Sequence, residues 1–327
     1  MSVISAETGK LLALSMLKGV GPATLRMALN VANFASASIE EIGKQVPRLT
    51  AVCQPVFWLE ALEKAEAQVD QAERAGARII SVLDSDYPAL LKATKDDPVI
   101  LYVKGHFSTT PERSVAVIGT REPTKHGVMI AERISQFLVS SGWSVVSGLA
   151  LGLDAIAHRA SVANGGHTIA VLAHGLHTVA PSKHRALAQE ILDKGGALVS
   201  EYRFGVDPRP ELFVKRDRIQ AGFAQGVVMV QSDLKGGSLH ASRAALGYGR
   251  WLAVPEPTRV DGYNVEPKVQ ANALIASGDN EKMSELLQCP MSALQRLIVL
   301  RSRDDYPKLL RTTGVSDVSC VNQTGLL

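Results

Sequence analysis

The sequence of 327 residues is poor in cysteine and contains no long apolar run. Its three cysteines, Cys53, Cys289 and Cys320, lie far apart and form no Cys-x-x-Cys pair. Such spacing excludes a disulfide framework and offers no zinc motif, so we expect reduced thiols without a functional role. No apolar run could span a bilayer, and no charged and apolar leader opens the chain. We therefore expect a soluble, cytoplasmic protein with no membrane association.

The chain also lacks a strong net charge and the usual dinucleotide motif. A formal charge of +3 permits nucleic-acid binding through a local basic patch but does not argue for it. The Gly-x-Gly-x-x-Gly fingerprint is absent from the glycine-rich turns, so no NAD or other cofactor is predicted. Five histidines fall close together, but their spacings match no zinc template, and we expect packed or surface side chains and no metal site: His158, His167, His174, His177 and His184.

Short apolar runs alternate with helical patterns through the middle of the chain. The run 115–118 is uniformly apolar and rich in β-branched residues, which is typical of a parallel strand buried on both faces. Similar runs predict strands over 77–82, 99–103, 143–146, 168–172, 197–201, 227–230 and 251–255. Helices are predicted between them over 128–138, 155–163, 181–192, 219–222 and 237–247. This rhythm predicts an α/β fold with a doubly wound, mostly parallel sheet.

Two further regions flank that sheet. Residues 1–75 are predicted to form a helical domain, 76–278 the α/β domain, and 279–327 a short helical tail with a helix over 283–300. In the first region, Pro22 follows a tight turn containing Gly19 and Gly21 and can open a second helix. The pattern resembles a helix-hairpin-helix, whose backbone N–H groups can contact a DNA phosphate, but a plain helical corner explains it equally well.

Two strand-to-helix turns are the main candidates for a binding site. One is Gly119-Thr120-Arg121, and the other runs from Ser147 and Gly148 to Gly152 and Asp154. Loops that follow parallel strands lie at the carboxyl edge of the sheet, where open α/β sheets bind ligands. We predict an anion site there, with tight turning as the alternative role of the glycines. Asp154 is expected to complement the start of a helix rather than to act in catalysis.

In order and spacing these motifs resemble the DprA (Smf) family. The resemblance covers roughly residues 76–256 and rests on seven segments: 119–121, 147–158, 166–172, 200–201, 213–219, 236–239 and 249–250. It implies an extended Rossmann fold, binding of single-stranded DNA, a homodimer, and transfer of incoming strands to a RecA-type recombinase in natural transformation. The positions that match the family's motifs, together with the glycine turns, form the predicted phosphate-binding set: Gly119, Thr120, Arg121, Ser147, Gly148, Gly152, Lys183, Lys215, Arg216, Arg218, Gly236, Gly237 and Ser238.

Several positions depart from the family pattern. Ala180 stands where the family has tyrosine, His184 where it usually has asparagine, and Asp217 likewise replaces an asparagine between Arg216 and Arg218. A carboxylate there can pair with the arginines and weaken the local field, or hold their geometry. The tail is too short for the winged-helix-like domain of many members. Its residues 305–311 echo residues 86–92, as coincidence or as a second copy of a small docking element.

The leading hypothesis is therefore a DNA-processing protein that protects single strands and loads a recombinase. The alternative is a nucleotide- or DNA-sensing regulator that acts as the antitoxin of a partner toxin in a phage-defence pair. A nucleotide hydrolase is the weakest reading, because no nucleophile with an oriented base is visible near Ser200 and Glu201. No enzyme is predicted.

Overall fold

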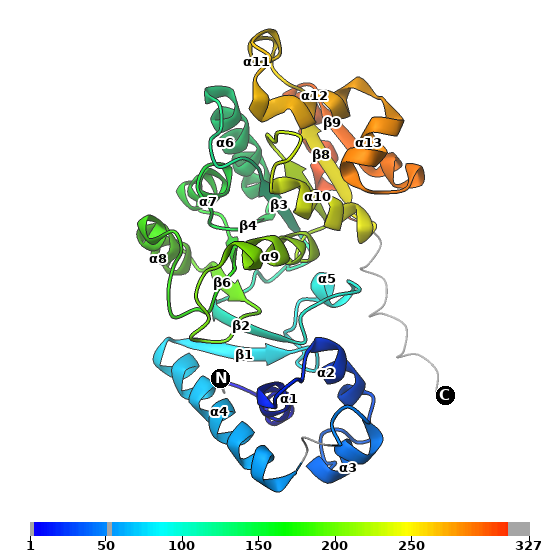
Figure 1. The fold of residues 1–327 in the computed structure, drawn as a ribbon. Helices are drawn as coiled ribbons and strands as arrows, with labels where there is room; N and C mark the ends of the chain where they lie inside the picture. Colours follow the sequence, from blue (N-terminus) through cyan, green and yellow to red (C-terminus); the bar gives the residue numbers. More distant parts are fainter. Residues whose placement is uncertain (1–2, 51–53, 313–327) are drawn as a thin grey trace, which may run out of the picture.

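The fold is described by a computed structural model that covers residues 3–50 and 54–312, so Cys53 and Cys320 lie outside the described residues. A single sheet forms its centre, with helices on both faces and the N-terminal helices at one edge (Figure 1). The strands are β1 (Ala77–Ser81), β2 (Ile100–Gly105), β3 (Ser114–Ile118), β4 (Ser144–Ser147), β5 (Thr168–Leu172), β6 (Ala197–Ser200), β7 (Gly226–Met229), β8 (Trp251–Pro255) and β9 (Leu297–Leu300).

The helices that surround the sheet come from all parts of the described chain. The α-helices are α1 (Ala6–Met16), α2 (Pro22–Leu29), α3 (Ile39–Gln45), α4 (Pro55–Arg74), α5 (Ala89–Lys92), α6 (Lys125–Ser140), α7 (Leu153–Ala163), α8 (Arg185–Asp193), α9 (Pro210–Gly222), α10 (Ser238–Gly247), α11 (Arg259–Tyr263), α12 (Gln270–Ser277) and α13 (Asn280–Leu287). Short 3-10 helices are η1 (Ser182–His184), η2 (Pro267–Val269), η3 (Met291–Arg296) and η4 (Arg303–Leu310).

The sheet is mostly parallel, as predicted. Its strand order is β1-β2-β6-β5-β4-β3-β7-β8-β9, and all pairs from β6 to β9 are parallel, whereas β2 is antiparallel to both β1 and β6. β3 pairs with β4 on one side and with β7 on the other, and all five of its residues are buried. A strand enclosed in this way has no solvated face, which explains its uniformly apolar sequence.

Alternate residues of β3 point into two different cores. Val115 and Val117 pack with Ile134 of α6, while Ala116 and Ile118 belong to the core that contains Ile219 of α9. Helices α6, α7 and α8 thus cover one face, and α9, α10 and α12 the other. Two covered faces are the defining feature of a doubly wound sheet, so this prediction is confirmed.

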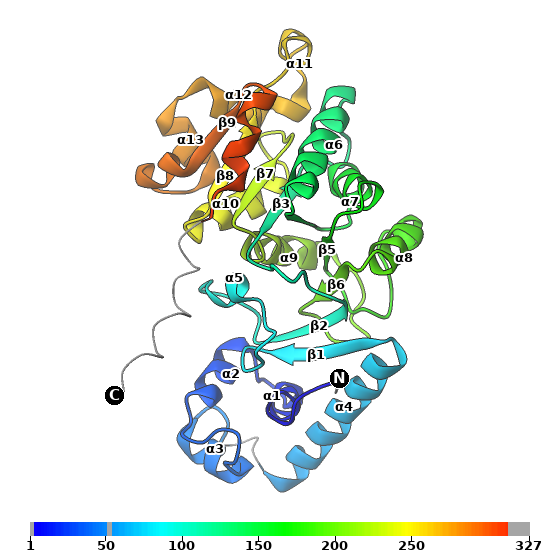
Figure 2. The same ribbon diagram turned by 180° about the vertical axis from the view of Figure 1, so that it is seen from behind.

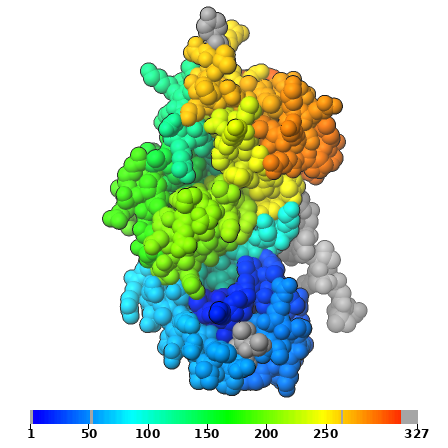
Figure 3. All heavy atoms as spheres, in the orientation of Figure 1, coloured from blue at the N-terminus to red at the C-terminus, as the bar shows by residue number. Residues whose placement is uncertain are grey.

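The N-terminal helices form a lobe packed on the β1 edge (Figure 3). The Thr8 hydroxyl donates to Asp84 Oδ2 at 2.5 Å, and Arg26 of α2 forms an ion pair with the buried Asp97 at 2.5 Å. Gly19 takes a φ of 79° in the turn after α1, and Pro22 opens α2, so the predicted succession of helix, glycine turn and second helix is confirmed. Contact of this turn with DNA stays a prediction.

The tail differs from the predicted helix over 283–300. α13 ends at Leu287, Pro290 precedes the 3-10 helix η3, and β9 follows as a strand parallel to β8 (Figure 2). Proline lacks the N–H that a continuing helix needs. The apolar run of β9 then extends the sheet, because pairing with β8 buries Ile298 and Leu300. A prediction from helical spacing alone missed both effects.

The two similar segments at 86–92 and 305–311 follow the strands at opposite edges of the sheet, β1 and β9. Their tyrosines have different surroundings. The Tyr87 hydroxyl donates to the Pro98 carbonyl, whereas the Tyr306 ring lies 5.6 Å from that of Phe137. The similar sequences therefore have different packing environments.

Candidate nucleic-acid interface

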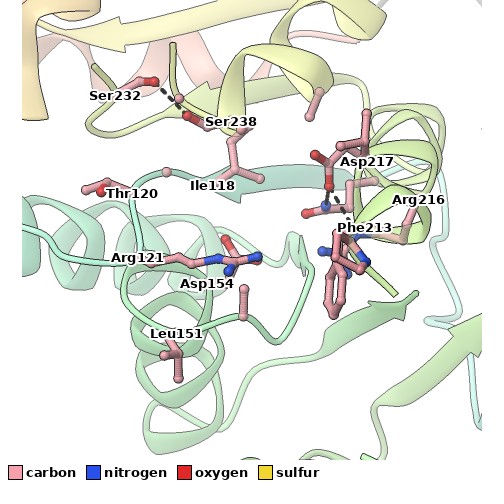
Figure 4. Close-up of a pocket in the computed structure, with 18 of the residues that line it drawn as sticks. Ile118, Thr120, Arg121, Leu151, Asp154, Phe213, Arg216, Asp217, Ser232 and Ser238 are labelled. Carbon is pink, nitrogen blue, oxygen red and sulfur yellow. Dashed lines mark hydrogen bonds and ion pairs between the residues drawn. The ribbon is translucent and has the colours of Figure 1, made fainter. Parts of the chain in front are cut away.

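A cavity of about 600 Å³ opens at the carboxyl edge of the sheet, where strand order reverses between β3 and β7. The loops after β3, β4 and β7 line it together with α9 (Figure 4). The surface is hollowed there, above α9 and between α7 and α10 (Figure 3). Open α/β sheets bind ligands at this reversal point. Seven residues of the predicted set line the cavity: Gly119, Thr120, Arg121, Arg216, Gly236, Gly237 and Ser238.

The two glycine turns meet, as the sequence predicted. A Cβ atom at Gly152 would lie 2.4 Å from the Thr120 carbonyl oxygen, and Gly152 has a φ of 75°. The Leu153 N–H donates to the same oxygen at 3.2 Å. Only glycine combines this backbone conformation with such close approach. The turn after β4 thus supports the turn that carries Arg121.

Buried polar groups fix the loop after β4 from below. The Arg216 guanidinium donates to the carbonyl oxygens of Gly148, at 2.8 Å, and Val171. A Cβ atom at Gly148 would lie 2.5 Å from Arg216 Cζ, so glycine makes room for the guanidinium. Asp154 lies in the first turn of α7, as predicted. Its Oδ2 accepts from the Gly148 N–H at 3.1 Å, so it also holds the loop after β4.

Two carboxyl groups accompany this buried arginine. Asp217 Oδ1 accepts from Arg216 Nε at 3.1 Å and from Gln220 Nε2 at 2.9 Å. Burial raises the pKa of Asp217 to about 6, against the opposing effect of Arg216. Burial also raises the pKa of Asp154, again opposed by Arg216. The charge of Arg216 is therefore largely used inside the protein, although its side chain lines the cavity.

Phe213 is a cavity residue that the predicted set left out. Its ring lies between two arginines, with Arg121 Cζ at 5.7 Å and Arg216 Cζ at 5.9 Å from the centroid. An aromatic ring at a cationic site can stack with a base. The sequence carried a signal for this role, because Phe213 lies three residues, about one helical turn, before Arg216.

The cationic stretch 215–218 is split by the helix that contains it. α9 begins at Pro210, earlier than predicted, and therefore turns its basic residues in different directions. Arg216 is buried, and Arg218 forms ion pairs with Glu201 at 2.5 Å and Asp96 at 3.8 Å. Lys215 is exposed and lines neither cavity described here. Arg218 likewise lies outside the cavity, so Arg216 is the one basic residue of this stretch among the described lining residues. Contact of Lys215 and Arg218 with DNA stays a prediction.

The remaining predicted residues have two locations. Ser147 lies behind the cavity, and its hydroxyl donates to the Val117 carbonyl at 2.7 Å. Gly152 and Lys183 line a second pocket of about 400 Å³, to which Arg121 also contributes. Arg159 on α7 lines this pocket too, although the sequence analysis did not select it. Gly152, Ala155, Ile156 and Arg159 share one helical face, and this spacing could have identified it.

The five clustered histidines occupy separate positions. His158 is buried with Nδ1 2.7 Å from the Thr168 hydroxyl, and His184 Nδ1 lies 2.8 Å from the Leu149 carbonyl oxygen, to which it donates. Leu149 has a φ of 58°, so His184 holds a strained residue of the loop after β4. Desolvation lowers the pKa of His158 to about 3. Within residues 3–50 and 54–312, no group of acidic, histidine or cysteine side chains is arranged to hold a metal ion.

Comparison with known proteins identifies the family. The sequence profile described as DNA recombination-mediator protein A matches residues 78–286. The chain belongs to this family. A similar family protein is Protein Smf of Escherichia coli, 37% identical over 59% of this chain and 52% of that protein. DNA processing protein DprA of Streptococcus pneumoniae is 33% identical over 63% of this chain and 73% of its own.

Solved structures of the family share the fold. The X-ray structure of DprA from Streptococcus pneumoniae has a TM-score of 0.70 and 24% identity, and covers 94% of this chain and 99% of that one. A structure of DNA processing protein A from Helicobacter pylori, described for its single-stranded DNA binding mode, has a TM-score of 0.53 and 28% identity over 62% and 88% of the two chains.

The chain spans about half to two thirds of the length of the first curated relatives, with 52% of the Escherichia coli protein, 64% of the Synechocystis protein and 61% of the Bacillus subtilis protein matched.

None of the described helices is long and apolar enough to span a membrane.

Proposed function

We propose that this protein is a recombination mediator that binds single-stranded DNA at the carboxyl-edge cavity. The observation that carries the proposal is Arg121, which projects over Phe213 and forms no ion pair with any described residue. A cationic side chain beside an aromatic ring offers a phosphate contact and a stacking surface together. Proteins that bind single-stranded nucleic acid commonly combine these two contacts.

Membership of the family and the Helicobacter pylori relative support this proposal. That relative is described for its single-stranded DNA binding mode, and its fold matches 62% of this chain. The glycine turns place Arg121, and the buried network around Arg216 keeps those turns in position. On this proposal the protein acts by binding and transfer rather than by catalysis, with a RecA-type recombinase as the receiving partner and a homodimer as the working form. No described feature favours the antitoxin alternative.

A salt-titrated binding experiment tests the proposal. A single-stranded dT oligonucleotide, a duplex and dTMP are compared, with wild-type protein and Arg121→Ala. We expect preference for the single strand, a linear fall of log affinity with log salt, and roughly tenfold weaker binding by R121A with a slope smaller by about 0.7. Arg113→Ala is the matched control, because Arg113 is exposed just before β3, at the opposite edge of the sheet.

Two results would contradict the proposal. One is the absence of a salt slope with the single strand, and the other is an equal loss of affinity in R121A and R113A. Transfer is tested separately, by following filament formation of a RecA-type recombinase on coated single strands. The proposal expects faster filament formation with the wild type than with R121A.

A further inference from the structure

The second pocket differs in charge from the large cavity beside it. Arg121 and Leu151 line both, so the two spaces adjoin. The large cavity contains three arginines and three aspartates: Arg121, Arg209 and Arg216 against Asp154, Asp217 and Asp233. The second pocket contains Arg121, Arg159 and Lys183, and its lining includes no carboxylate. An anion is thus favoured more strongly in the second pocket.

The three cations of this pocket are available to a ligand. None of them forms an ion pair or a side-chain hydrogen bond with another described residue, in contrast to Arg216 and Arg218. Glu122, which follows Arg121 in the sequence, forms its ion pair with Lys268 at 2.9 Å and not with Arg121. Arg159 and Lys183 are both exposed, so a ligand can reach them without displacing a protein partner.

The backbone at the pocket adds to this preference. Gly152 precedes α7, a helix of 11 residues, and lines the pocket at the start of that helix. The positive end of the helix dipole therefore faces the same space as the three side chains. Apolar residues of the same helix, Ala155 and Ile156, form the rest of that wall. A phosphodiester group, which is small and singly charged, suits such a lining.

We infer that the second pocket binds the phosphodiester next to the nucleotide whose base lies in the large cavity, with Arg159 as a DNA-binding residue. This inference rests on the proposed function. It assigns different parts of the DNA strand to the large cavity and to the second pocket. The nearly neutral cavity with Phe213 receives a base, and the cationic pocket receives backbone. Arg121, which lines both, contacts the phosphate at the boundary between them.

Variants of Arg159 test this assignment by their response to salt. With a dT12 oligonucleotide, Arg159→Ala is expected to weaken binding by about twofold to fivefold and to reduce the salt slope by about 0.7. Arg159→Lys should keep the slope, and Arg113→Ala should match the wild type. Circular dichroism and thermal melting verify that each variant is folded, as expected for an exposed side chain.

A second readout removes the charge from the ligand instead. Unlabelled TpT and its methylphosphonate analogue, which has a neutral linkage, compete with labelled dT12. The wild type should prefer TpT, and this preference should be smaller in R159A, which keeps Arg121 and Lys183 at the pocket. An unchanged preference in R159A, or an unchanged salt slope, would overturn the inference while R121A still defines the DNA site. If the wild type shows no salt-dependent binding of dT12, the proposed function fails as well.

Discussion

Arg121 and Arg216 both lie against the ring of Phe213 but have different surroundings. Arg216, at the floor of the cavity, is buried and donates to the backbone carbonyls of Gly148, in the loop after β4, and Val171, in β5. Arg121, at the rim, is exposed and without an ionic partner among the described residues. The role of each arginine depends on whether the backbone and acidic groups around it need its N–H donors and its charge. Arg216 builds the site, and Arg121 is left for the ligand.

The largest expected effect comes from removing the arginine at the floor. Arg216→Ala leaves Asp154 and Asp217 buried without their cationic partner and the Gly148 carbonyl without its donor. Loss of one member of a buried charge network typically costs about 3–5 kcal/mol. We expect a loss of unfolding free energy of this order in urea titration, with R121A within about 0.5 kcal/mol of the wild type. Equal stability of R216A and R121A would contradict the structural role of Arg216.

The turns that place Arg121 give the next effect. Gly152→Ala introduces a Cβ atom against the Thr120 carbonyl at a positive φ, and we expect it to destabilise the protein by about 1–3 kcal/mol. Gly237→Ala is the matched control. Gly237 also lines the cavity, but it has a φ of −58° and no atom within 4 Å of an added Cβ. The free energy of unfolding in urea, measured for both variants, should fall in G152A and stay close to the wild type in G237A. Equal losses in the two variants would contradict a supporting role for the Gly152 turn.

The turns and strands were predictable from sequence because their causes are local. The run 115–118 had to be buried on both faces, and glycine turns after two parallel strands had to share one edge. The positions of the Arg216 and Arg218 side chains depend on partners distant in the sequence, such as Gly148 and Glu201. No local pattern shows which face of α9 meets those groups. For the same reason β9 was missed, since it exists by pairing with β8.

A third prediction separates charge from stacking at the rim. Phe213→Ala should weaken binding of a dT oligonucleotide by about 1–3 kcal/mol, the usual contribution of a base stacked on an aromatic side chain. Its salt slope should equal that of the wild type, because no cation is lost. R121A, in contrast, should lower the slope. A reduced salt slope in F213A would mean that the Phe213 ring acts mainly by positioning Arg121. That result would contradict a separate stacking role for Phe213.

The smallest expected effect concerns Asp217, whose burial raises its pKa to about 6 from the ordinary value of 3.8 for an aspartate. Between these two pH values the folded chain holds more protons than the unfolded chain, so Asp217 makes stability fall as pH rises from about 4 to 6. The ionised carboxylate also adds negative charge to the cavity that receives a base and its phosphate. Binding of dT12 should therefore strengthen as pH falls through 6.

Asp217→Asn isolates this effect from the titration of nearby histidines. A unit charge roughly 8 Å away in water contributes about 0.5 kcal/mol, so we expect a pH-dependent change of about twofold to threefold in the wild type beyond that in D217N. Fluorescence anisotropy at constant ionic strength, from pH 5 to 7.5, measures it. If the affinities of the wild type and D217N depend on pH in the same way, Arg216 neutralises the Asp217 charge. The ionisation of Asp217 would then have no effect on the ligand bound by Arg121.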